Sequence, residues 1–80
     1  MATSVARQVP PLAVDVRVDD ERLVIVLSDG RELSVPVEWF PRLRDAESGQ
    51  RSAWRLIGGG LGIHWPELDE DISVESLLNP

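Results

Sequence analysis

The strongest structural signal in the sequence is a three-part apolar pattern over residues 12–37. Its first part alternates charged residues with Val14, Val16 and Val18, which is the period-two pattern of a strand with one buried face. Residues 23–27 follow as an unbroken apolar run rich in β-branched side chains, and this run predicts a central strand covered on both faces. Asp-Gly at positions 29–30 then precedes a third alternating segment, a strong indication of a hairpin. The pattern therefore predicts a three-stranded antiparallel meander.

The third strand of this meander should end at a sheet edge. Pro36 has no amide hydrogen to donate to a neighbouring strand, so proline is confined to edges and strand exits. The edge at residues 34–37 offers one route to a structural homodimer.

Short helices are predicted after the meander. Pro41 suits the first turn of a helix, so residues 42–46 are expected to form one turn. Ser48 is the expected cap of a second helix over residues 50–55. The apolar side chains in and just after this helix are expected to face the sheet: Ala53, Trp54, Leu56 and Ile57. Ser73 should cap a final helix.

These elements predict an α+β fold. An N-terminal three-stranded antiparallel meander would pack with a glycine-loop and extended segment and with two or three short helices. We expect one domain over residues 12–80, preceded by a flexible tail over residues 1–11 that ends in two prolines.

Composition and charge exclude several function classes. The chain has no cysteine, which excludes disulfides, thiolate zinc sites and a cysteine nucleophile. It has no apolar run long enough for a membrane span or a signal peptide, so a cytoplasmic location is expected. Fourteen acidic residues against eight arginines give a formal net charge of −6, which disfavours direct nucleic-acid binding and favours a basic protein partner.

A glycine-rich loop invites a phosphate-binding interpretation; its glycines are Gly58, Gly59, Gly60 and Gly62. A phosphate cradle needs a helix that begins directly after the loop, whereas here a short extended segment at residues 63–65 is stopped by Pro66. We therefore favour a tight turn with positive φ angles that joins two extended segments. A ligand loop is the weaker alternative.

The only histidine, His64, stands just before a run of carboxylates: Glu67, Asp69, Glu70 and Asp71. No histidine pair or calcium-loop spacing organises these groups into a metal site. We predict a partly buried, hydrogen-bonded histidine and a solvated acidic turn, and we predict no cofactor, metal or catalytic residue. A small-ligand binder or enzyme that uses His64 beside the glycine loop is the alternative function.

Three tryptophans are many for 80 residues. Tryptophan is enriched both in cores and at interface hot spots. Trp54 is predicted to lie in the core. Trp39 and Trp65 each stand near a proline and a predicted surface turn, so they are candidates for a partner-binding surface together with His64 and the acidic turn.

The string Gly58-Gly59-Gly60-Leu61-Gly62-Ile63-His64-Trp65-Pro66 and its acidic continuation resemble the bacterial domain-of-unknown-function family 2442. The resemblance extends to residues 29–31, 39–43 and 54–58 and covers residues 12–78. It implies a small α+β domain similar to one that precedes a helix-turn-helix in a Nitrosomonas protein. These 80 residues hold no such appended domain, so no DNA-binding role is carried over. The resemblance transfers no catalytic residue.

Genes of this family often stand beside that of another small protein, in an arrangement like toxin–antitoxin pairs. Together with the net acidity, this leads us to expect a non-enzymatic protein-binding module, possibly an antitoxin-like partner of a small basic protein. The ligand-binding and homodimer alternatives stay open at this point.

Overall fold

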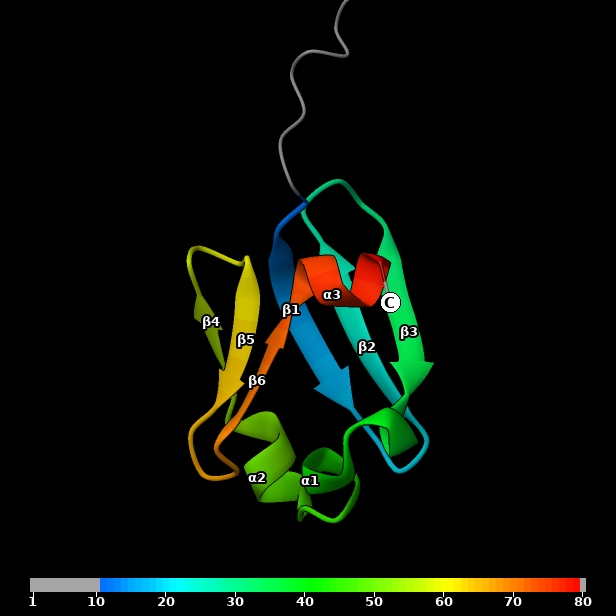
Figure 1. Cartoon of the computed structure of the whole chain (residues 1–80), viewed down its shortest axis with the longest axis vertical. Helices are drawn as coiled ribbons and strands as arrows, with labels where there is room; N and C mark the ends of the chain where they lie inside the picture. The colour runs from blue at the N-terminus through cyan, green and yellow to red at the C-terminus, as the bar shows by residue number, and fades with distance from the viewer. Residues whose placement is uncertain (1–10, 80) are drawn as a thin grey trace, which may run out of the picture.

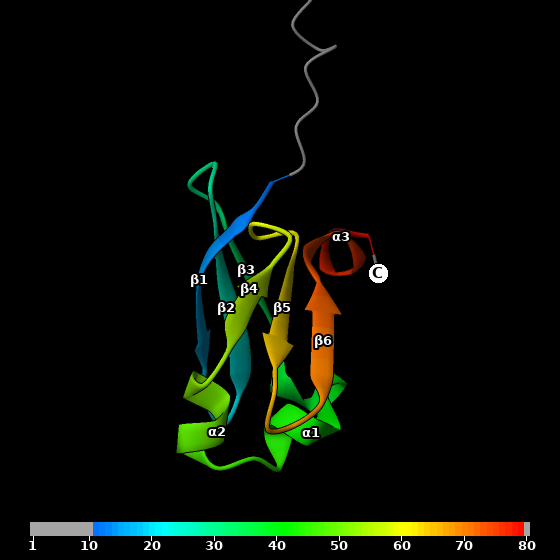
Figure 2. The same cartoon turned by 90° about the vertical axis from the view of Figure 1, so that its left-hand side faces the viewer.

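Two three-stranded antiparallel sheets face each other across one apolar core in a computed structural model that describes residues 11–79 (Figure 1, Figure 2). The first sheet has the order β1-β2-β3, with bounds Ala13–Val18, Arg22–Leu27 and Glu32–Pro36. The second has the order β4-β5-β6, with bounds Arg55–Ile57, Gly62–Trp65 and Glu70–Ser73. The predicted α+β class and the N-terminal meander are confirmed. The predicted tail lies, except for Pro11, outside the described residues.

Short helical turns connect and close the sheets. The turn η2 (Val37–Trp39) and helices α1 (Pro41–Arg44) and α2 (Ser48–Ser52) join the two sheets at one end, and α3 (Val74–Leu78) follows β6. No helix among residues 11–79 is long and apolar enough to cross a membrane.

The β1 strand departs from strict alternation. The register with β2 shifts between Ala13 and Asp15, which is the mark of a β-bulge. The extra residue lets Ala13 and Val16 both face the core and leaves Val14 52% exposed. The expectation that all three valines share one buried face is therefore wrong at Val14, while Val16 is buried and Val18 partly so.

The central strand β2 is buried on one face only. Leu23, Ile25 and Leu27 are fully buried, and the alternate residues Val24 and Val26 are half-buried. The prediction of two covered faces is thus wrong, because the second sheet packs on one side of the meander and no layer formed by residues 11–79 lies on the other.

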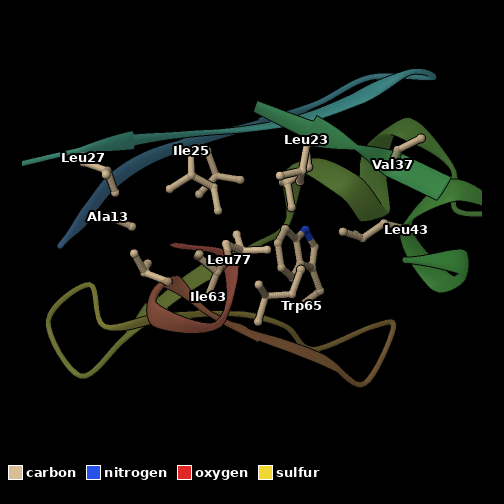
Figure 3. Packing of buried hydrophobic residues seen from close by; sticks show 13 residues of the cluster. Ala13, Leu23, Ile25, Leu27, Val37, Leu43, Ile63, Trp65 and Leu77 are labelled. Carbon is tan, nitrogen blue, oxygen red and sulfur yellow. The ribbon is translucent and has the colours of Figure 1, made fainter. Parts of the chain in front are cut away.

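The core fills the space between the sheets (Figure 3). Leu23 and Ile25 from β2 face Ile63 and Trp65 from β5, and Leu43 of α1 closes one side. The Trp65 side chain is fully buried and its indole Nε1–H donates to the Arg51 carbonyl at 3.0 Å. Burial with a satisfied N–H is what makes a tryptophan stable in a core.

The segment between the sheets differs most from expectation. The cap of α2 is Glu47, whose side chain accepts from the backbone of Gln50 while the Gln50 side chain accepts from the Glu47 N–H at 3.0 Å. Ser48 is therefore inside the helix, and the helix ends at Ser52. Residues 55–57 instead form the edge strand β4.

Leu56 and Ile57 are 36% and 43% exposed on β4, so the expectation that they bury against the sheet is wrong. The predicted cap of the last helix is confirmed, because Ser73 Oγ accepts the Ser76 N–H at 3.0 Å.

Candidate functional site

Most carboxylates lie at one end of the molecule, drawn at the bottom of Figure 1. This acidic end consists of the β1–β2 turn with the first residue of β2, the segment from η2 to α2, and the β5–β6 turn with the start of β6 (residues 19–22, 37–52 and 66–71). It holds ten acidic residues and four arginines, a formal charge of −6. The other described residues hold four acids and three arginines, a formal charge of −1. The charge of the domain is therefore strongly polarised.

Hydrogen bonds tie the three segments of the acidic end together. The buried Arg51 guanidinium donates to the Leu43 carbonyl at 2.9 Å, the Arg44 carbonyl at 2.7 Å and the Asp20 carboxylate at 2.8 Å. Arg42 reaches across to the Asp69 carbonyl at 2.6 Å, which fixes the β5–β6 turn to α1. The arginines of this end are thus largely occupied inside it.

Local donors keep carboxylates at this end ionised. The backbone N–H groups of Arg22 and Glu21 donate to Asp19 and hold its pKa below the ordinary value of 3.8. The guanidinium of Arg44 lowers the pKa of Asp45 in the same direction by hydrogen bonding to it. The acidic end is therefore negative at neutral pH.

Trp39 is the exposed aromatic residue of the acidic end. In the η2 turn, Val37 is buried and Phe40, three residues later, packs against the core, since residues three apart share a face of a 3₁₀ turn. Trp39 falls on the other side and is 53% exposed, next to the exposed Glu38. The prediction of a surface position is confirmed for this tryptophan.

Trp65 does not belong to the surface. It was predicted as a partner contact because Pro66 and an acidic turn follow it, but its side chain is fully buried between the sheets. The proline ends β5 without bringing the indole to solvent. Trp54, predicted as a core residue, is half-buried and packs against the core.

The predicted acidic turn divides into two parts. Glu67 and Asp69 are exposed in the turn, and Asp69 has a positive φ of 52°. Glu70 and Asp71 instead begin β6, where Glu70 is partly buried. All four carboxylates remain within the acidic end.

His64 lies in a row of polar side chains on the second sheet. The register pairs Arg55 with His64 and His64 with Asp71, so the three stand side by side across β4, β5 and β6. Nδ1 of the His64 ring contacts the Asp71 carboxylate directly. The partly buried, hydrogen-bonded histidine that the sequence predicts is confirmed.

Neither surface groove described for residues 11–79 reaches this row. One, of about 410 Å³, is lined by Pro11, Leu61 and residues of α3, and the other lies between β1 and α2. Within the same residues, no three histidine or carboxylate side chains converge as metal ligands.

The glycine loop is a tight hairpin turn between β4 and β5, as predicted. Gly58, Gly59 and Gly60 all have positive φ. A Cβ at Gly60 would lie 2.5 Å from the Ala13 carbonyl oxygen, and the Gly60 carbonyl accepts the Ala13 N–H at 2.8 Å. Glycine is therefore required where the hairpin meets β1, and close backbone packing accounts for it.

Taken together, these features define a small two-sheet α+β domain with one strongly acidic end. A family model described as "Protein of unknown function (DUF2442)" matches residues 13–80, and the chain belongs to this family. It is similar to a protein of unknown function from Rhodospirillum rubrum ATCC 11170 whose crystal structure is known. The two are 31% identical, with a TM-score of 0.73 and 86% of each chain covered. No curated protein matches the chain.

Proposed function

We propose that this domain is a non-enzymatic protein-binding module that presents Trp39 and the surrounding carboxylates of the acidic end to a small basic protein. The observation that carries the proposal is the 53% exposure of Trp39 at the end that holds ten of the fourteen acids. Tryptophan is a frequent interface hot spot because it offers a large, rigid apolar surface.

Electrostatics supports a basic rather than an acidic or neutral partner. A surface of one sign attracts and orients a partner of the opposite sign and accelerates its association. Four arginines offset part of the charge of the ten acids, and this end keeps a formal charge of −6. The contact surface of the proposal comprises Trp39, Glu38, Glu67 and Asp69, without Trp65.

Rigidity also favours binding through this end. The buried Arg51 and the capping box of α2 hold the connections in one conformation, which lowers the entropy lost on association. The antitoxin-like role is the specific form of this proposal in which the neighbouring gene encodes the partner.

Co-expression with the product of the adjacent gene tests the proposal. A complex should copurify, and W39A should weaken it by about tenfold or more. Because the attraction is electrostatic, raising the salt concentration should also weaken it. L61A is the matched control, since Leu61 is 49% exposed but lies on the glycine hairpin. The absence of any complex at micromolar concentration, or an equal effect of both variants, would refute the proposal.

A further inference from the structure

The four sheet edges of the described residues differ in how they are protected against pairing with another strand. The edge at β1 carries a bulge, Asp15 and Arg17, and α2 packs against the strand. The β3 edge carries Glu32 and Pro36. The β6 edge begins with Glu70 and Asp71. Bulges, charges, prolines and short strands are among the devices by which proteins block edge pairing.

The outer edge of β4, which faces the viewer in Figure 2, is short and carries one charge, Arg55, but it has neither a bulge nor a proline. Its other residues, Leu56 and Ile57, are apolar and exposed, and nothing in the described residues pairs with this side of the strand. An exposed apolar edge is a template for a further strand.

The distribution of charge along the chain indicates which strand pairs with the β4 edge. The acidic end repels the same end of a second copy, whereas residues 48–66 contain no Asp or Glu. The β4–β5 hairpin lies inside this stretch, so two copies can meet there without bringing carboxylates together.

We propose that the β4 edge pairs antiparallel with β4 of a second copy, so that two three-stranded sheets join into one of six strands. A two-fold axis at Leu56, the middle residue, sets Leu56 opposite its own counterpart and Arg55 opposite Ile57 of the second copy. No like charges then stand directly opposite each other. This surface is separate from the acidic end, so the inference does not depend on the proposed function.

A three-residue strand forms few hydrogen bonds and buries little area. The dimer is therefore weak and depends on concentration, as small interfaces generally do. Residues 34–37, expected from the sequence as the dimer edge, are the less suitable strand because Pro36 cannot donate.

Sedimentation velocity of the full chain, from micromolar to about 1 mM, tests the inference. The wild type should dimerise with rising concentration. I57K places a lysine opposite Arg55 of the second copy and should weaken the dimer at least about fivefold. The double variant R55E/I57K places a glutamate opposite that lysine and should restore the dimer. S34K, on the β3 edge, is the matched control and should leave the dimer unchanged.

A monomer at every concentration, or weakening by S34K but not I57K, would overturn the inference, as would a swap that fails to restore pairing. Circular dichroism checks that each variant is folded. If I57K unfolds, cysteine cross-linking replaces it, since the chain has no other cysteine. L56C should then form a symmetric disulfide and S34C should not; the reverse would overturn the pairing.

Discussion

Trp39 and the β4 edge are both exposed apolar surfaces, but they lie in opposite electrostatic surroundings. Trp39 stands next to Glu38 at an end of formal charge −6, whereas Leu56 and Ile57 belong to a stretch without acids. The charge that surrounds an exposed apolar side chain indicates which kind of partner it suits. We therefore propose a basic protein as the partner of the first surface and a second copy of the chain as the partner of the other.

The variant with the greatest expected loss of stability is W65A, which removes a side chain from the core beneath both surfaces. W65A should lower the free energy of unfolding by about 3–5 kcal/mol, because it leaves a cavity between the sheets. W39A is the control and should cost less than about 0.5 kcal/mol, since its side chain is mostly in water. Urea denaturation measures both; equal losses would mean that Trp39 is structural and would weaken its assignment as a contact.

A second variant, G60A, disturbs only the β4–β5 hairpin. G60A forces an L-residue to φ 115° with its Cβ against the Ala13 carbonyl, and it should cost about 2–4 kcal/mol. G49A, in helix α2 with free space around it, should be neutral or stabilise by up to about 1 kcal/mol. Thermal unfolding compares the two. If G60A were harmless, the hairpin would not be held against β1.

A third variant disturbs only the acidic end. R51M keeps most of the buried volume but removes the guanidinium that donates to the Arg44 carbonyl and, beside the Ala46 N–H, to the Leu43 carbonyl, which should cost about 1–3 kcal/mol. Chemical denaturation gives the loss, and R44M, at an exposed position, is the control with little expected effect. At denaturant concentrations where R51M remains folded, self-association through β4 should persist.

The smallest effect is dependent on pH. D19N removes a carboxylate that accepts two backbone N–H groups and whose folded pKa is lowered. The stabilisation is present above the unfolded value near 3.8 and is lost as the pH falls through the folded pKa. D19N should therefore lower the melting temperature at pH 7, and the difference from wild type should vanish toward pH 2. A difference that persisted in acid would show that ionisation of Asp19 is not the cause.

The first sheet could be predicted from sequence and most of the second could not. Residues 12–37 carry alternation, an apolar run and an Asp-Gly turn, which are local signals that act within one hairpin at a time. β4 has three residues and β6 four, too few to show a period, and both exist because β5 pairs with them. For this reason the sequence predicts Arg55 as the end of a helix and places Glu70 and Asp71 in a turn.

The candidate site, too, could be predicted from sequence only in part. The exposure of Trp39 and the acidic turn could be predicted from their neighbours in sequence. The burial of Trp65 could not, because it depends on a sheet that packs against Leu23 and Ile25 from the other half of the chain. The absence of acids from residues 48–66 was visible in the sequence, but it gained meaning only once β4 was seen to be an edge.

The most direct test of the two assignments measures two properties in the same two variants. Binding to the adjacent-gene product and self-association are each followed by sedimentation for W39A and I57K. W39A should lose the partner and keep the dimer, while I57K should lose the dimer and keep the partner. Loss of both properties in one folded variant, or the reverse pattern, would contradict it.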